Sequence, residues 1–91
     1  MTSQHPLLST PGKKMIPVIA SFDAQGNIRP LYARINELDY KILSSVSIQA
    51  TREYVGFECR IEDYGRIKKF ELFFSLEARV WFIEYSGRIS I

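Results

Sequence analysis

The chain has 91 residues, of which 46% are hydrophobic and twelve are aromatic. This length allows one small domain rather than two, and the composition excludes an intrinsically disordered body. The net charge is +2, and Lys13 and Lys14 account for all of it, because the rest of the chain carries ten basic and ten acidic side chains. A nearly neutral body disfavours the strong positive field by which nucleic-acid-binding proteins gather phosphates.

Residues 1–14 contain two prolines, a glycine and small polar side chains without sustained periodicity, and they predict a flexible tail. A single domain is expected over residues 15–91. No apolar run reaches the ~18 residues of a membrane span, and the N-terminus lacks the pattern of a signal peptide. Together with the single cysteine, Cys59, this predicts a cytoplasmic protein.

The first regular segment is expected to be a strand over residues 16–22, with Pro17 at its start or on a sheet edge. Asp23 can open a tight turn, and Gly26 can adopt a positive φ, so residues 23–27 predict a hairpin connection. The returning strand is expected over residues 28–35.

The middle of the chain fits two interpretations. Residues 36–39 can form a turn, and apolar side chains then alternate from residue 40 to residue 48, which favours two strands joined by a turn. The alternative is a helix over residues 31–46 that begins after Pro30, which would make the domain α+β. The side chains at helical spacing are Leu31, Ile35, Leu38, Ile42 and Val46.

The last forty residues alternate apolar and polar side chains over three segments, 54–61, 67–74 and 79–85. Gly65 marks a second hairpin turn, over residues 62–66. The whole pattern predicts an all-β domain of five or six antiparallel strands. Closure would remove the exposed sheet edges, so we expect a small barrel, SH3-like or related.

Short segments on these strands carry a resemblance to a protein family. They are Arg29-Pro-Leu, Arg34-Ile, Tyr40-Lys-Ile, Val46, Phe57-Glu-Cys-Arg-Ile61, Phe70-Glu-Leu72 and Trp81-Phe-Ile83. Over residues 28–85 they resemble short uncharacterised β domains of bacteria. In those domains the first hairpin ends in a Tyr-x-Val or Tyr-x-Ile strand, and the last strand begins at a tryptophan. Some relatives accompany DNA-repair polymerases, so the resemblance implies a repair-linked role; it carries over no catalytic residue.

The residues that catalysis needs are scarce. His5 is the only histidine and falls in the expected tail, and Cys59 alternates with core positions rather than with surface ones. Glu62 and Asp63 are adjacent in an expected turn, where turn formation is their ordinary role. We therefore expect no enzymatic activity, no metal site and no cofactor.

The final strands are apolar on both faces. If Phe70, Leu72 and Phe74 fill the core, Phe73 points the other way, and neighbouring side chains of the last strand also oppose one another. The second apolar set needs a cover: tight curling of the barrel, a terminal segment of this chain, or another chain. The third choice predicts a non-catalytic interaction module, acting as a homodimer or with a protein partner. Its expected interface is Phe73, Trp81, Ile83 and Tyr85.

A second function is compatible with the alternation. Tyr32, Arg34, Tyr54 and Arg60 are all expected to point away from the core. Exposed tyrosines stack with bases and arginines bind phosphates, so the alternative is a barrel that binds single-stranded nucleic acid, with Lys13 and Lys14 as an electrostatic arm. Cross-strand pairs that solvate an ordinary sheet explain the same residues.

Overall fold

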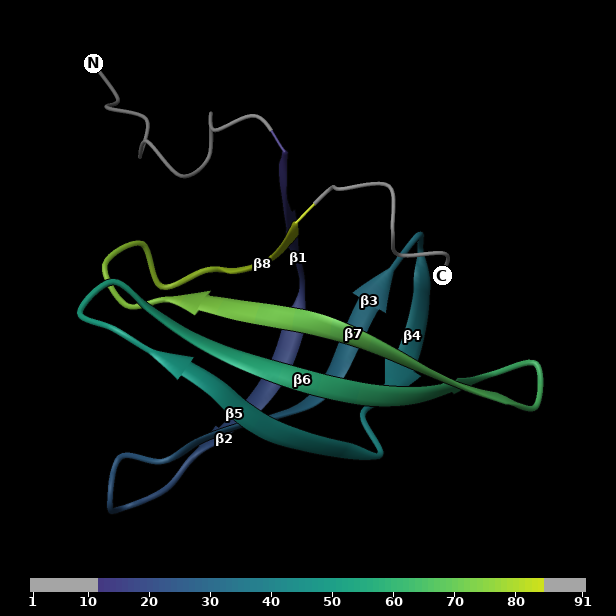
Figure 1. Cartoon of the computed structure of the whole chain (residues 1–91), viewed down its shortest axis with the longest axis horizontal. Helices are drawn as coiled ribbons and strands as arrows, with labels where there is room; N and C mark the ends of the chain where they lie inside the picture. The colour runs from purple at the N-terminus through teal and green to yellow at the C-terminus, as the bar shows by residue number, and fades with distance from the viewer. Residues whose placement is uncertain (1–11, 85–91) are drawn as a thin grey trace.

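The computed structural model describes residues 12–84, which form two antiparallel sheets and contain no helix (Figure 1). The strands are β1 (Lys13–Ile16), β2 (Val18–Phe22), β3 (Ile28–Ile35), β4 (Leu38–Lys41), β5 (Ser44–Ala50), β6 (Tyr54–Asp63), β7 (Arg66–Ser75) and β8 (Trp81–Glu84). The five-stranded sheet has the order β1-β8-β7-β6-β5, and the three-stranded sheet has the order β2-β3-β4. The prediction of an all-β domain is confirmed, and the alternative helix over residues 31–46 is wrong.

A two-residue turn explains why the middle segment is not helical. Asn36 and Glu37 have φ values of 51° and 67°, so both lie in the left-handed region that hairpin turns of this length require. The turn sets Ile35 opposite Leu38 and Arg34 opposite Asp39. The helical spacing of Leu31, Ile35 and Leu38 is therefore overridden by a reversal of the chain.

The two other hairpin turns, at residues 23–27 and at Tyr64–Gly65, follow the predicted chemistry. The Asp23 carboxylate accepts hydrogen bonds from the backbone N–H of Gln25 at 2.9 Å and of Asn27 at 2.8 Å, and Gly26 has a φ of 85°. In the second hairpin, Tyr64 and Gly65 supply the two positive φ values, 52° and 78°. Both hairpins are where the sequence predicted them.

Two of the expected strands are each divided between the sheets. Pro17 separates β1 from β2, because it has no N–H to donate, and its carbonyl accepts a hydrogen bond from Arg34 N at 3.0 Å. The chain crosses again between β4 and β5, where Ile42 N donates to Leu31 O in one sheet and Leu43 N donates to Arg60 O in the other. Strand pairing gives two sheets among the described residues, so closure into a single barrel stays a prediction.

The main core lies between the facing sides of the two sheets. Its buried members are Ile16, Ala33, Ile35, Tyr40, Ile42, Phe57, Cys59, Ile61, Phe70, Leu72, Phe74, Trp81 and Ile83. A hydrogen bond also joins the sheets: the Tyr40 hydroxyl of β4 donates to Asp63 Oδ1 of β6 at 3.3 Å. Within the five-stranded sheet, Lys68 Nζ donates to the other carboxylate oxygen, Asp63 Oδ2, at 2.9 Å. Each sheet thus buries one face against the other, as the alternation predicted.

The domain begins earlier than the sequence predicted. Lys13 and Lys14 belong to β1, where they lie opposite Glu84 and Ile83 of β8, so placing these two lysines in a flexible tail is wrong. Their backbone groups complete one edge of the five-stranded sheet. The rest of the predicted tail, together with His5 in it, lies outside the described residues apart from Gly12.

Candidate functional site

Three of the four residues of the predicted interface are buried within the single chain. Phe73 is 8% exposed, Trp81 7% and Ile83 5%, and they lie on opposite faces of the five-stranded sheet. Trp81 and Ile83 join the core between the sheets, whereas Phe73 belongs to a separate cluster on the outward face. The expectation that they form one exposed aromatic surface is therefore wrong for these three residues. Tyr85 lies outside the described residues.

The chain itself covers the second apolar face. Phe73 and Phe82 form the buried centre of the outward cluster, and the partly buried residues packed on them are Met15, Tyr54, Ala78 and Val80. The Tyr54 and Phe82 rings meet edge to face at 5.5 Å, and the Lys13 ammonium lies 5.4 Å from the centre of the Phe82 ring. The cover therefore comes from β1, from the start of β6 and from the connection between β7 and β8.

The four residues of the nucleic-acid hypothesis do not share one surface. Tyr32 and Arg34 lie on the outward face of the three-stranded sheet, and Tyr54 and Arg60 lie on the outward face of the five-stranded sheet. The core separates the two pairs. Lys13 bonds to Glu84 at 3.3 Å instead of extending into solvent as an arm. The stacking platform expected from the alternation is thus not assembled in one place.

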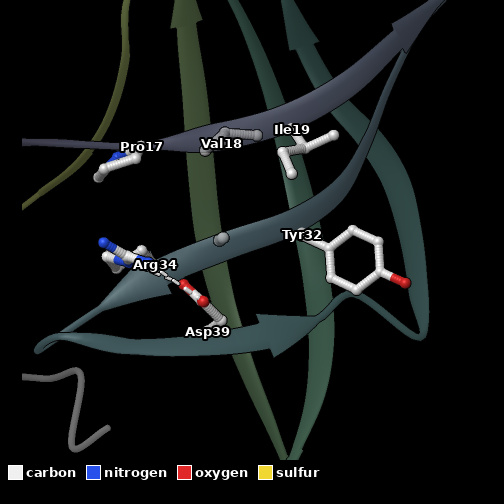
Figure 2. Close-up of a pocket in the computed structure, with 7 residues that line it drawn as sticks. Pro17, Val18, Ile19, Tyr32, Arg34 and Asp39 are labelled. Carbon is white, nitrogen blue, oxygen red and sulfur yellow. Dashed lines mark hydrogen bonds and ion pairs between the residues drawn. The ribbon is translucent and has the colours of Figure 1, made fainter.

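The outward face of the three-stranded sheet carries an exposed candidate site. Ile19 of β2 and Tyr32 of β3 lie directly opposite each other, and they are 64% and 43% exposed. Figure 2 shows these two side chains on neighbouring strands. They line a shallow hollow of about 480 Å³. We call this surface the Ile19–Tyr32 face; its residues are Pro17, Ile19, Tyr32, Arg34 and Asp39.

An ion pair borders the apolar part of the Ile19–Tyr32 face. Arg34 and Asp39 are cross-strand neighbours on β3 and β4; Arg34 Nε donates to Asp39 Oδ1 at 2.8 Å and Nη2 donates to Oδ2 at 3.2 Å (Figure 2). The hydrogen bond from Arg34 holds the pKa of Asp39 below its usual range, and the same bond raises the pKa of Arg34. Both side chains are more than half exposed, so the pair orients the arginine more than it stabilises the fold.

The sequence pointed to Tyr32 and Arg34 but missed the other residues of this face. Ile19 was missed because every second residue from Ile16 was assigned to the core. Ile19 falls between these positions. An apolar residue out of phase on a short strand was the available signal. The contribution of Asp39 had no such signal, since it depends on the two-residue turn that places Asp39 opposite Arg34.

Cys59 is a free cysteine, and its burial changes the pKa of its thiol. Burial, with a smaller contribution from the Glu58 charge, raises the pKa of the Cys59 thiol from 9.0 to about 12, so the thiol stays protonated at neutral pH.

Nowhere in residues 12–84 do three or more His, Cys, Asp or Glu side chains gather in an arrangement that could hold a metal ion. The same residues contain no helical segment capable of spanning a bilayer.

Comparisons with known proteins give no relative for this chain. No family model matches it, and neither the curated proteins nor the solved structures include a significant match.

Proposed function

We propose that this chain is a non-catalytic interaction module that binds a protein partner through the Ile19–Tyr32 face. The observation that carries the proposal is the exposed Ile19–Tyr32 pair beside a hollow, bordered by a fixed Arg34–Asp39 ion pair. Large apolar side chains exposed next to each other mark interaction surfaces more often than scattered ones do.

The composition of this face matches what stabilises protein interfaces. Tyrosine and arginine are enriched among the residues that contribute most to binding, and full burial of an isoleucine is worth roughly 1.5–3 kcal/mol. The bidentate geometry keeps Arg34 extended along the rim, where its remaining N–H groups can donate to partner carbonyls or carboxylates. The partner we expect presents one apolar side chain to the hollow and hydrogen-bond acceptors to Arg34.

Two further predictions accompany this role. We propose that the module is cytoplasmic, which the buried free thiol of Cys59 supports, since reduced cysteines are typical of that compartment. We also propose that it is related to SH3-like barrels. The support is the backbone hydrogen bonding at Pro17 and at Ile42–Leu43, the two corners where the chain passes from one sheet to the other.

The test uses peptides displayed as a random library against the immobilised protein. Selected peptides are expected to shift the backbone amide resonances of Ile19, Tyr32 and Arg34 in the labelled protein. Tyr32→Ala should weaken their binding about tenfold or more, as loss of a central tyrosine does at other interfaces. Tyr64→Ala is the matched control, because Tyr64 is almost fully exposed at the tip of the β6–β7 hairpin. Peptides that map elsewhere, or that bind equally to Tyr32→Ala, would contradict the proposal.

Single-strand binding is the weaker alternative, because Tyr54 is packed on Phe82 and Arg34 is engaged by Asp39. A titration with labelled single-stranded DNA at low salt tests it. Binding that weakens steeply with salt and is lost in Arg60→Ala would favour this function over the first.

A further inference from the structure

The edge strands of the two sheets differ in how strongly their sequences oppose pairing with a further strand. The five-stranded sheet ends at β1 and β5, and the three-stranded sheet ends at β2 and β4. In an antiparallel sheet, every second residue of an edge strand directs its N–H and C=O groups outward, ready to pair with another strand. Natural edges are blunted by shortness, charge, proline or bulges. Among the described residues, β1 has four residues including two lysines, β4 has four residues including Asp39 and Lys41, and β2 follows directly on Pro17.

Strand β5 lacks most of these guards. It spans the seven residues from Ser44 to Ala50, Ser-Ser-Val-Ser-Ile-Gln-Ala, without a charge or a proline. Its one guard is a bulge between Ser47 and Gln49 in the ladder with β6. Within the described part of the chain β5 pairs with β6 alone, and it lies at the margin of the sheet in Figure 1.

Both faces of β5 are open to solvent. Val46, opposite Glu58, is exposed on the outward face. Ser47 and Ala50, opposite the core residues Phe57 and Val55, are exposed on the other face. An added strand would therefore be accepted beside β5 without displacing a packed side chain.

We propose that β5 pairs antiparallel with β5 of a second copy of this chain, joining two five-stranded sheets into one continuous sheet. The occupant is a second copy because the uncharged β5 can lie against itself without opposing like charges, whereas self-pairing of β1 or β4 would bring lysines together. Strand β2 is also uncharged, but it has only five residues, follows directly on Pro17 and has a bulge between Ile19 and Ala20. Pairing centred on Ser47 places Val46 of one copy opposite Ile48 of the other, and two-fold symmetry forms this β-branched pair twice.

The predicted dimer is weak. A contact made by one strand from each copy buries less than the roughly 1,200 Å² of a stable interface, so dimerisation should depend on protein concentration. The pairing does not involve the Ile19–Tyr32 face. Failure of one of the two proposals would therefore leave the other unaffected.

Sedimentation equilibrium of the purified protein over a wide concentration range tests this pairing. The wild type should show a monomer–dimer equilibrium, and Val46→Lys should weaken it about tenfold or more, because it removes both Val46–Ile48 contacts and sets two like charges diagonally across the two-fold axis. Ile67→Lys is the matched control, because Ile67 is 58% exposed and Val46 is 56% exposed, and Ile67 lies on β7, which β6 separates from β5. It should dimerise as the wild type does.

Hydrogen exchange on the wild type supplies a readout that needs no variant. Outward-facing amides within Ser44–Ala50 should exchange more slowly as the protein concentration rises, whereas amides at the edge of β2 should not change. A monomer at every concentration, or protection at β2 in place of β5, would overturn the proposal. So would a dimer that Ile67→Lys disrupts and Val46→Lys leaves intact.

Discussion

Phe73 and Phe82 lie opposite each other on β7 and β8, with their ring centroids 5.3 Å apart and their planes inclined by 19°. The pair sits on the outward face of the five-stranded sheet, and yet both rings are buried. This small second core explains how a strand pair that is apolar on both faces can exist in a single chain. The buried aromatic side chains of these strands therefore contribute to the stability of the fold.

Removing a ring from the second core should destabilise the protein without changing its assembly. Phe82→Ala deletes a buried aromatic side chain and should lower the free energy of unfolding by about 3–5 kcal/mol. Phe22→Ala is the control, because Phe22 is largely exposed and only touches Phe74 edge to face; it should cost about 1 kcal/mol or less. Urea denaturation measures both costs. Equal costs, or a dimer constant altered by Phe82→Ala, would contradict a purely structural role.

Gly56 lies beneath the same cluster, and its missing side chain makes room for a ring. A Cβ at this position would lie 2.8 Å from Phe73 Cε1 and 3.0 Å from Phe73 Cδ1. Gly56→Ala should therefore destabilise the fold by about 1–3 kcal/mol through overpacking, since Phe73 is held in place by its stacking on Phe82. In a Phe73→Leu background the same alanine should cost less. A cost that is unchanged in that background would argue against a steric cause.

The Cys59 thiol should make the protein less stable at alkaline pH. The folded state raises the pKa of Cys59 to about 12, above the value of the unfolded chain, so its proton stabilises the folded form fully only below about pH 8.5. This contribution is lost as the pH rises toward 12. Unfolding free energies measured from pH 8 to pH 12 should fall more steeply for the wild type than for Cys59→Ala. Parallel curves for the two proteins would contradict the assignment.

The Asp23 turn should have the opposite dependence, at acidic pH. The hydrogen bond that Asn27 Nδ2 donates to Asp23 Oδ2 at 3.0 Å is the largest of the causes that hold the pKa of Asp23 below its usual range. The stability that the ionised carboxylate contributes is present above about pH 4 and is lost as the pH falls through the folded pKa. Carbon-detected NMR titration should show the lowered pKa. Asn27→Ala should return it toward the ordinary value, and an unchanged titration would contradict the role of Asn27.

Much of the local structure of this protein could be predicted from the sequence, because two of its hairpin turns contain residue types that favour turns. Asp23 and Gly26 marked one hairpin and Gly65 another, and both formed where they were predicted. Strand β3 runs from Ile28 to Ile35, the bounds expected from alternation. Cys59 is fully buried, in keeping with its place among alternating core side chains.

The candidate site was only half predicted, because it is assembled from different strands. Tyr32 and Arg34 were expected to be exposed, and they are, but their neighbours Ile19 and Asp39 are set by the pairing of β2 and β4 with β3. Register between strands depends on bulges and turns, such as the shift at Ile19 and Ala20, that a period-two pattern does not encode.

Alternation in the sequence by itself favoured an all-β domain over the helical alternative and determined which side chains share a face of most strands. Only the tertiary structure decided what covers each face. It sends Trp81 into the core between the sheets and Phe73 into a second cluster, and it sets Tyr32 and Tyr54 on different sheets. The physical reason is that alternation is a local property of the backbone. Which segment packs on a given face of a strand depends instead on where the chain crosses between the sheets, at Pro17 and at Ile42–Leu43.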